Sequence, residues 1–366
     1  MIRKSIKKIG VLTSGGDCPG LNAVIRGVVR SATEREWEVI GFSDGYEGMI
    51  SPVRYRRLDA SGIDDIMAMG GTILGTTNKG RFVAKVGEGK KATIPRAILS
   101  EARETFEGLG LDALVCIGGD GSLSTALQLQ QAGIPVVGVP KTIDNDLNAT
   151  AMTFGFDSAV AVVVDALDRL HTTARSHKRL MVVEVMGRHA GWIALHGGLG
   201  GGADAILIPE IPYLMDKLVQ FVKNRTHDGF GSTMIVVAEG AKEEGKSLAT
   251  KEAKLRKKGE VRLGGIGERL AVELEAATGQ EARSVSLGHL QRGGTPSALD
   301  RILATRFGVG AVRLIEQRRF GQMVSYLKYH VGGVPIARAV GTLRTVDSEC
   351  ETVAAARSVG ICFGDR

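Results

Sequence analysis

The stretch Ile134-Pro135-Val136-Val137-Gly138-Val139-Pro140-Lys141-Thr142-Ile143-Asp144-Asn145-Asp146 joins an apolar segment directly to a run of chemically active side chains. Its first half, 134–139, is the short apolar run that predicts a buried strand. Its second half places a lysine, a hydroxyl and two carboxylates next to one another. Asp144 and Asp146 are two residues apart, so they point the same way on an extended chain. One acid can take a proton from a hydroxyl while the other stays near a phosphate site. A solvated turn is the alternative interpretation.

The same strand-then-loop pattern recurs along the chain and predicts an α/β fold. Apolar runs that alternate with amphipathic segments indicate a mainly parallel sheet covered by helices on both faces. In such sheets ligands bind at the carboxyl ends of the strands. The predicted strands are 9–13, 38–42, 113–117, 134–139, 180–185 and 234–238, and the predicted helices are 21–33 and 122–131.

Composition narrows the class of function. The chain has 366 residues, which favours two domains, and it contains 50 glycines, many of them in short loops where backbone can approach a ligand. The net charge is +7, but aromatic residues make up only 5% and no basic stripe or zinc-ligand pattern is present, so anionic small substrates fit better than nucleic acid.

The cysteines and the N-terminal sequence predict a reduced, cytoplasmic protein. Cys18, Cys116, Cys350 and Cys362 form no CxxC motif. The first residues lack the apolar region of a signal peptide, and the apolar run 159–164 is too short to span a bilayer.

Two glycine turns follow predicted strands. In Gly15-Gly16-Asp17-Cys18-Pro19-Gly20, glycines leave backbone N–H groups facing an anion at the start of a helix, although many such turns are glycine-rich for packing alone. In Gly118-Gly119-Asp120-Gly121-Ser122, the glycines let a polyphosphate lie against the backbone, and Asp120 is placed to hold Mg²⁺. The second turn is neither a Walker A loop nor a GxGxxG motif.

Two further motifs carry cations at strand ends or between glycines. Met186-Gly187-Arg188 ends the predicted strand 180–185, and Arg188 alone could be a solvated charge. In Gly288-His289-Leu290-Gln291-Arg292-Gly293-Gly294, His289 and Arg292 can both donate to a phosphate, whereas a lone histidine there would more often be structural.

In this order, the motifs resemble the phosphofructokinase family, over residues 9 to about 308. The resemblance implies transfer of a phosphoryl group to the 1-hydroxyl of D-fructose 6-phosphate in glycolysis. It also implies two similar Rossmann-like domains with the active site in the cleft between them, and a homo-oligomer, most often a tetramer. We expect a nucleotide- and Mg²⁺-binding domain of residues 1–147 and about 265–310. The fructose 6-phosphate domain would then hold about 148–264 and 311–366, with the tail after Phe320 packed on it.

The resemblance also implies roles for individual residues. Asp144 matches the catalytic base, Thr142 a contact to the transferring group, Arg188 the arginine that neutralises it, and Asp120 and Asp146 the acids around Mg²⁺. The donor-phosphate loops match Gly16, Gly119, Asp120, Gly121 and Ser122. The sugar-phosphate site matches Thr142, Ile143, Asp144, Met186, Gly187, Arg188, Glu210, His289 and Arg292, with Arg179 and Arg283 reaching in from a neighbouring subunit.

The donor is predicted from two positions. The family's pyrophosphate users typically have aspartate where this chain has Gly121, and lysine at the position of Lys141; well-known ATP users have glycine at both. An acid at position 121 would crowd and repel the α-phosphate of ATP, so Gly121 favours ATP as co-substrate. Asn78 stands where many ATP users have an arginine, and Lys79 or Arg81 could replace that contact.

The resemblance also extends to an effector site for ADP and phosphoenolpyruvate, which looks degraded here. Arg26 and Arg30 are retained, but Ala60 and His171 replace expected arginines, and 228–232 lacks the family's lysines. A site for a multivalent anion should weaken without these cations. We therefore expect weak or absent activation by ADP.

Three alternatives stay open from the sequence. One is a pyrophosphate-dependent fructose 6-phosphate 1-phosphotransferase. Another is a catalytically silent regulatory subunit that binds sugar phosphate, which the intact Asp144, Asp146, Thr142 and Arg188 oppose. A more distant kinase that shares the Gly-Gly-Asp-Gly turn, such as a nicotinamide-dinucleotide kinase, is disfavoured by the motifs 186–188 and 288–294.

Overall fold

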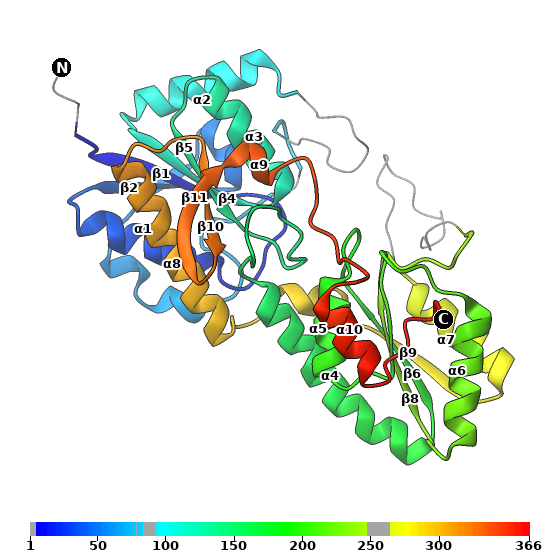
Figure 1. The fold of residues 1–366 in the computed structure, drawn as a ribbon. Helices are drawn as coiled ribbons and strands as arrows, with labels where there is room; N and C mark the ends of the chain where they lie inside the picture. The colour runs from blue at the N-terminus through cyan, green and yellow to red at the C-terminus, as the bar shows by residue number, and fades with distance from the viewer. Residues whose placement is uncertain (1–4, 78, 83–92, 247–263) are drawn as a thin grey trace. The chain divides into compact units, whose positions relative to one another are not determined.

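The computed structural model describes residues 5–77, 79–82, 93–246 and 264–366. The chain divides into two compact units, each built around its own sheet (Figure 1). The first unit comprises Met1–Ile143, Leu147–Ser158 and Arg292–Leu343. The second comprises Asp144–Asp146, Ala159–Gln291 and Arg344–Arg366.

The sheet of the first unit is mainly parallel. Within the described residues it has seven strands in the order β11-β10-β5-β4-β1-β2-β3. Only the two edge strands, β3 and β11, run antiparallel to their neighbours. The strands are β1 (Lys8–Thr13), β2 (Glu38–Phe42), β3 (Tyr55–Leu58), β4 (Ala113–Gly118), β5 (Val136–Pro140), β10 (Gln322–Leu327) and β11 (His330–Pro335).

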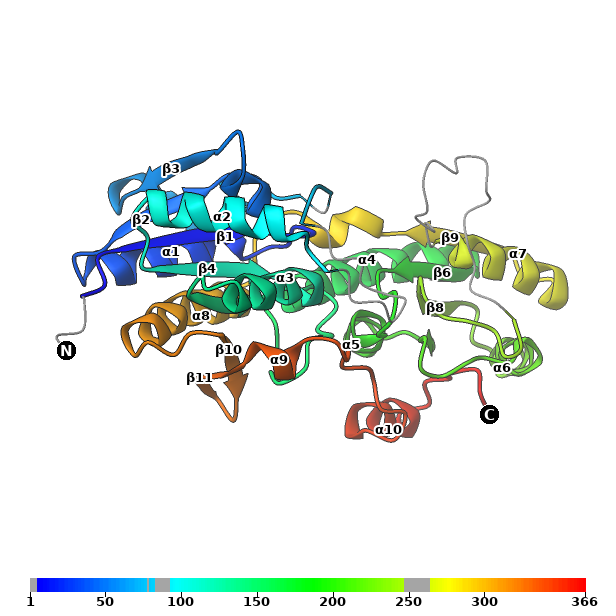
Figure 2. The same ribbon diagram turned by 90° about the horizontal axis from the view of Figure 1, so that it is seen from above.

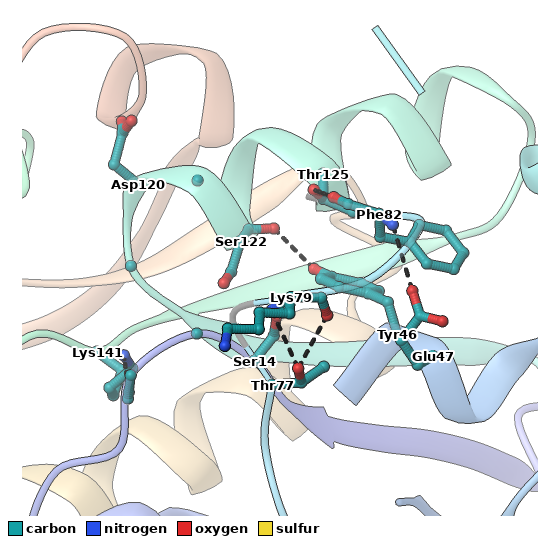
Figure 3. A pocket seen from close by; sticks show the side chains of 14 residues that line it. Ser14, Tyr46, Glu47, Thr77, Lys79, Phe82, Asp120, Ser122, Thr125 and Lys141 are labelled. Atoms are coloured by element: carbon teal, nitrogen blue, oxygen red, sulfur yellow. Dashed lines mark hydrogen bonds between the residues drawn. The ribbon is translucent and has the colours of Figure 1, made fainter. Parts of the chain in front are cut away.

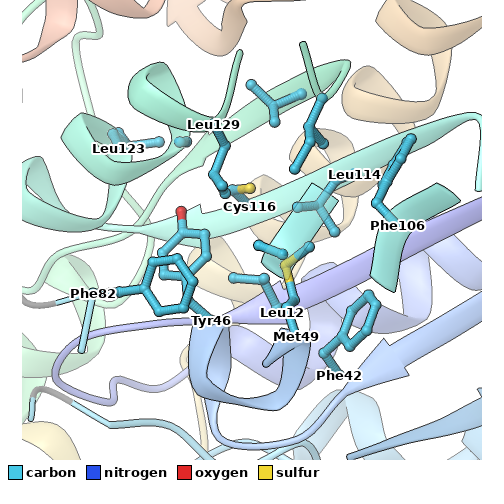
Figure 4. Close-up of a cluster of buried hydrophobic side chains, with 14 of the residues drawn as sticks. Leu12, Phe42, Tyr46, Met49, Phe82, Phe106, Leu114, Cys116, Leu123 and Leu129 are labelled. Carbon is cyan, nitrogen blue, oxygen red and sulfur yellow. The ribbon is translucent and has the colours of Figure 1, made fainter. Parts of the chain in front are cut away.

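Both faces of this sheet are covered by helices, as the uninterrupted apolar strands predict. Successive strand residues face opposite sides. On one side Leu12, Leu114 and Cys116 belong to a buried cluster that α2, α3 and α9 complete (Figure 4). On the other side α1 and α8 pack together, and α8 also contacts β5 and β10 (Figure 1). The helices are α1 (Leu21–Thr33), α2 (Arg96–Gly108), α3 (Asp120–Gln131), α8 (Ala298–Glu316) and α9 (Ile336–Ala339), with the short turns η1 (Gly45–Met49), η2 (Ser61–Ile63) and η3 (Asp65–Ala68).

The second unit has a smaller parallel sheet, with the described strands in the order β7-β8-β6-β9. Each strand is followed by a loop or helix, and the buried cluster of this unit packs α6 and α7 on the sheet. The strands are β6 (Leu180–Val185), β7 (Ala205–Leu207), β8 (Thr233–Ala238) and β9 (Ala282–Ser286). The helices are α4 (Phe156–His177), which begins in the first unit, α5 (Trp192–Gly200), α6 (Met215–His227), α7 (Ile266–Thr278) and α10 (Glu351–Ser358), with the turn η4 (Gly288–Arg292).

The predicted fold class is confirmed, and most of the predicted elements agree with the structure to within two residues. The division of the chain differs from the expected one at two segments. Residues 265–291 lie in the second unit, because β9 pairs with β6 and α7 packs beside it. Residues 311–343 lie in the first unit, because β10 pairs with β5 and leads through β11 into α9 (Figure 2). Only the part of the tail from Arg344 onward packs in the second unit.

The glycine-rich stretch 197–202 is helical as far as Gly200, where α5 ends. A Cβ at Gly197 would lie 2.6 Å from a methyl of Val163 on α4. A Cβ at Gly198 would lie 2.7 Å from Ile206 on β7. These glycines therefore let α5 approach its neighbours closely, and packing overrides their low helix propensity.

Among the described residues, no helix has the length and apolar content needed to cross a membrane. All four cysteines are free thiols, as predicted. The densely charged stretch 242–262 falls largely on residues 247–263, which lie outside the described residues.

Helices α1 and α8 touch through backbone at two glycines. A Cβ added at Gly308 would lie 2.5 Å from the Val24 carbonyl oxygen, and one at Gly27 would lie 2.8 Å from the Thr305 carbonyl oxygen. We expect Gly308→Ala to lower the free energy of unfolding by about 1–3 kcal/mol, because the helices must separate. Gly108→Ala is the matched control, since its Cβ would meet nothing within 4 Å at the end of α2. Thermal unfolding of both variants checks this, and an equal effect at the two positions would contradict the packing argument.

A buried carboxylate joins the start of α8 to the start of α4. Asp300 accepts hydrogen bonds from Ser158 N (2.8 Å) and Ser158 Oγ (2.6 Å). Ser297 caps α8 by accepting from Asp300 N, and donates to Asp157. Burial raises the pKa of Asp300 from its ordinary value of 3.8 to about 6, and the hydrogen bonds from Ser158 and Gly155 offset only part of this.

This raised pKa predicts a pH dependence of stability. Between pH 4 and 6 the folded protein holds the Asp300 proton more tightly than the unfolded chain, so the free energy of unfolding falls as pH rises through that window. The loss should be about 2 kcal/mol between pH 4 and 6 and should total about 3 kcal/mol once the pH is well above 6. Asp300→Asn keeps an oxygen acceptor but cannot titrate, so its unfolding free energy should fall less than that of the unchanged protein between pH 4 and 6. Denaturant titrations at several pH values measure both slopes, and parallel slopes would refute the assignment.

Candidate active site

The first glycine turn leaves β1 and enters α1. Ser14 N donates to the Ile117 carbonyl (2.9 Å), which attaches the turn to the end of β4. Gly15 and Gly20 have φ of 85° and 101°, and Gly20 is the residue that precedes α1. The ring of Phe154 lies 2.8 Å from where a Cβ of Gly20 would be. Glycine at position 20 is therefore required by both conformation and space.

The second turn leaves β4 and enters α3. A Cβ at Gly118 would lie 2.3 Å from the Cβ of Ser122, so the strand can turn into the helix only without a side chain there. Asp120 is the first residue of α3, and one of its carboxylate oxygens accepts Gly341 N at 2.9 Å. The amino end of α3 therefore presents backbone N–H groups and a partial positive charge, an arrangement that suits phosphate.

Lys141 follows β5 and ties the two turns together. Its backbone N donates to the Gly118 carbonyl (3.0 Å), and its ammonium donates to the Gly16 carbonyl (2.5 Å). The side chain is 5% exposed. Lys141 thus supplies a cation to the first glycine turn and a backbone contact to the second.

These turns form one wall of a cavity of about 250 Å³ in the first unit (Figure 3). The opposite wall is aromatic, because the rings of Tyr46 and Phe82 lie 5.5 Å apart there. Tyr46 Oη donates to the Ser122 carbonyl (2.7 Å), and burial raises the pKa of Tyr46 well above its ordinary value. The cavity is lined by Ser14, Gly15, Gly16, Tyr46, Glu47, Thr77, Lys79, Phe82, Gly119, Asp120, Gly121, Ser122, Thr125 and Lys141.

The structure distinguishes the two cations predicted near the donor. Lys79 lines the cavity. Arg81 pairs with Glu47, with its Nε 3.3 Å from Oε2, and donates to the Ser51 carbonyl. Asn78 lies outside the described residues.

Thr142 and Ile143 continue from Lys141 in the first unit. The Thr142 carbonyl accepts the Thr153 hydroxyl at 2.7 Å, which fixes the backbone beyond β5. Ile143 is fully buried. The part of the motif that lies in the first unit therefore ends at the buried side chain of Ile143. Asp144 to Asp146 belong to the second unit.

In the second unit, Met186 to Arg188 lie at the carboxyl end of β6. Gly187 has a φ of 141°, and a Cβ at Gly240 would lie 2.1 Å from the Arg188 carbonyl oxygen, so two turns meet closely here. Burial and the charge of Arg188 lower the pKa of His189, whereas the charge of Asp146 raises it. This pattern shows that Asp146, Arg188 and His189 share one electrostatic environment.

Two residues near this end of the sheet, Glu239 and Gln291, were not predicted as site residues from the sequence. Glu239 follows β8, and its backbone N donates to the Val185 carbonyl (2.9 Å), so it stands level with the end of β6. Gln291 is fully buried, accepts Met186 N (3.3 Å) and donates to the Gly288 carbonyl (3.1 Å). Glu239 could have been predicted as a polar residue directly after a predicted strand. Gln291 lies inside the motif 288–294, of which only His289 and Arg292 were predicted to bind a ligand.

The carboxylate of Glu210 accepts hydrogen bonds from two backbone N–H groups. It accepts Gly191 N (3.0 Å) and Val346 N (2.7 Å), and burial raises its pKa. These contacts join the start of α5 to the C-terminal segment. The sugar-hydroxyl role predicted for Glu210 stays a prediction.

The remaining predicted residues lie on β9, on η4 and near β6. Arg179 and Arg283 both pair with Glu281 within the chain, with Arg179 Nε 2.8 Å from the carboxylate. Arg292 lies in the first unit and donates to the Asp17 carbonyl (3.1 Å), beside Gly16. His289 is exposed on η4. The structure therefore brings Arg292 to the first glycine turn.

Within the described residues, no three His, Cys, Asp or Glu side chains gather as a metal cage. Magnesium that arrives with a polyphosphate needs only one or two protein carboxylates, because phosphate and water oxygens complete its shell. Asp120 lies on the cavity wall at the amino end of α3. Its carboxylate suits such an ion.

The whole arrangement matches one known family. A family model described as phosphofructokinase matches residues 8–315. The chain belongs to the phosphofructokinase family. It is 50% identical over 359 residues to a protein of Chloroflexus aggregans named ATP-dependent 6-phosphofructokinase, and the match covers 98% of both chains. The family predicted from the motifs is confirmed.

Two other comparisons bear on the donor and the fold. A protein of Amycolatopsis methanolica named pyrophosphate–fructose 6-phosphate 1-phosphotransferase is 48% identical over 343 residues, covering 93% of this chain and 97% of that protein. The crystal structure of Pichia pastoris phosphofructokinase in the T-state superposes with a TM-score of 0.80 at 31% identity. That match covers 98% of this chain but only 37% of the yeast chain.

Proposed function

We propose that this protein is an ATP-dependent 6-phosphofructokinase. It transfers the γ-phosphoryl group of ATP to the 1-hydroxyl of D-fructose 6-phosphate and releases ADP and fructose 1,6-bisphosphate. The observation that carries the proposal is the cavity of the first unit, in which phosphate-binding turns and an aromatic wall face one another. The relative of Chloroflexus aggregans, whose name states this activity, supports it over nearly the full chain.

The shape of the cavity favours a nucleotide over pyrophosphate. Pyrophosphate would use only the polar end, formed by Gly16, Gly119 and Lys141. The wall made by Tyr46 and Phe82 offers apolar contact, which suits a nucleoside and gives nothing to an inorganic anion. Gly121 lines the cavity in the first turn of α3 and, having no side chain, adds neither bulk nor charge there.

Pyrophosphate as the donor remains the second candidate. Lys141 adds a buried cation to the phosphate end, and the Amycolatopsis methanolica relative bears the name of a pyrophosphate enzyme. Lys141 also donates to Gly16, so it can hold the first turn in place whichever donor is used.

The proposed chemistry depends on positioning and charge more than on covalent help. Asp144 accepts the proton of the sugar hydroxyl as it attacks, and Thr142 contacts the transferring group. Arg188 offsets the negative charge of the transferring group. Lys79 contacts the donor phosphates. Asp120 would hold Mg²⁺, which draws negative charge from the donor phosphates. The role of Asp146 as an acid beside Mg²⁺ stays a prediction.

The residues proposed to bind the sugar phosphate are those that the family resemblance implies. His289 and Arg292 bind the 6-phosphate, and Met186 and Gly187 contact the sugar. Arg179 and Arg283 serve a neighbouring subunit of a homotetramer, in which they would exchange their pairing with Glu281 for a phosphate. The cytoplasmic location stays a prediction.

Initial rates with fructose 6-phosphate and Mg²⁺ test the donor. We expect turnover with ATP and little with pyrophosphate at equal concentrations, because the aromatic wall contributes binding only to a nucleoside. Omission of fructose 6-phosphate is the control for background hydrolysis. Turnover with pyrophosphate alone would replace ATP by the second candidate, and turnover with neither would reject both.

Substitution of Asp144 tests the base. Asp144→Ser should lower kcat by about 10²- to 10⁴-fold, the usual contribution of general base catalysis. The affinity for fructose 6-phosphate should stay nearly the same, because proton transfer stabilises the transition state and not the bound substrate. Asp216→Ser, at an exposed carboxylate of α6, is the control variant. If kcat were nearly unchanged in Asp144→Ser, the base would be another residue.

A further inference from the structure

Glu47 is a largely buried acid on the wall of the donor cavity, and its contacts go to one short segment. It lies in η1, and its side chain is 16% exposed. Its Oε1 accepts the backbone N–H of Arg81 (2.5 Å) and of Phe82 (3.3 Å), while Oε2 pairs with the Arg81 guanidinium. One carboxylate therefore holds the backbone and one side chain of residues 81–82.

Gly80 allows this close approach. A Cβ at position 80 would lie 2.4 Å from Glu47 Oε1, and the residue has a φ of 126°. A larger residue would displace either the segment or the carboxylate. The segment 79–82 therefore fits this carboxylate with little space to spare.

The other end of the segment is attached to the first glycine turn. Thr77 Oγ1 accepts Lys79 N (3.0 Å) and donates to the Lys79 carbonyl (2.8 Å). The Thr77 carbonyl in turn accepts Gly15 N at 3.2 Å. Lys79 is thus held between an anchor on the phosphate turn and an anchor at Glu47.

Because the segment is attached at both ends, the side chains of Lys79 and Arg81 are directed to different places. The Lys79 side chain runs along the cavity toward the side where Lys141 lies (Figure 3). The Arg81 guanidinium is drawn to Glu47 and to the Ser51 carbonyl (3.0 Å). The same carboxylate also fixes Phe82, whose ring forms the aromatic wall with Tyr46.

We propose that Glu47 is a positioning residue for the phosphoryl donor: it holds residues 79–82 so that Lys79 faces the donor phosphates and Arg81 is kept aside. The inference rests on the proposed function, because it concerns the donor site of that reaction. Glu47 acts through Lys79 and Phe82 and makes no contact with the transferring group itself. Its loss should weaken donor binding and leave the sugar site unchanged.

The test compares Glu47→Ala and Glu47→Gln with Lys79→Met and the double variant Glu47→Ala/Lys79→Met. Glu47→Ala should raise the KM for ATP about tenfold, the size expected when one charge-assisted contact is lost, while kcat changes less than about twofold. Glu47→Gln retains one oxygen acceptor, so its effect should be smaller. In the Lys79→Met background, Glu47→Ala should add little, because the two residues act through one contact. The KM for fructose 6-phosphate should not change.

Two readouts and one control variant separate this role from a merely structural one. Melting temperatures show whether each variant is folded, and Glu47→Gln serves if Glu47→Ala is not. Glu107→Ala, at an exposed ion-paired acid of α2, is the control for loss of a surface charge. Calorimetric titration of Mg²⁺-ATP into each folded variant measures donor affinity without turnover.

The outcomes distinguish this inference from the proposed function. If the unchanged protein turns over ATP but its KM is insensitive to Glu47, or if the effects of Glu47→Ala and Lys79→Met multiply, only the role of Glu47 is refuted. If the protein uses pyrophosphate and not ATP, the proposed donor is wrong, and the same comparison made on the KM for pyrophosphate decides the role of Glu47. If it neither binds nor uses either donor, both proposals fail.

Discussion

The register of the three parallel strands β1, β4 and β5 determines where the glycine turns and Lys141 of the first unit lie. Thr13 on β1 pairs with Ile117 on β4, and Ile117 pairs with Val139 on β5. Because parallel strands so aligned end at one level, the chain must leave the sheet three times at the same place. The glycine turns after β1 and β4 and Lys141 after β5 are the residues found at those exits. A slip of one residue would move their backbone donors and turn every side chain to the opposite face.

At the strand ends so aligned, the positive charge comes from a helix end and a buried lysine and not from exposed side chains. The amino end of α3 contributes a partial charge through its backbone N–H groups. Lys141 is 5% exposed and is held by the Gly16 carbonyl, so its position is fixed before any ligand arrives. A site prepared in this way loses little conformational entropy on binding an anion. The aromatic wall is fixed in the same way, because the Tyr46 hydroxyl donates to the Ser122 carbonyl within the second turn.

The sequence was sufficient for features that depend on neighbouring residues. Apolar runs bounded by glycine predicted β1, β2, β4 and β6 closely, and the helix after each glycine turn began where the turn required it. Four of the five candidate motifs were found for the same reason, since each directly follows a predicted strand. The family, once named from them, is confirmed.

Features that depend on distant contacts were missed. Residues 322–327 look like any short apolar run, and only their pairing with β5 assigns them to the first unit. The contact of Glu47 with Arg81 spans 34 residues, and nothing in the sequence near either residue indicates it. The backbone contacts of Glu210 with Gly191 and Val346 were also not predicted, and its role toward the sugar stays a prediction.

The glycines show why composition could indicate a ligand site without locating it. Gly15 and Gly20 adopt positive φ in a turn, the use that the sequence suggested. Gly27 and Gly308 instead let α1 and α8 touch through backbone, and Gly197 and Gly198 make room on α5 for the side chains of Val163 and Ile206. Both uses follow from the missing Cβ, one through conformational freedom and the other through space. A surplus of glycine therefore reports close approach of backbone in general, and only the position after a strand or inside a helix separates approach to a ligand from approach to another helix.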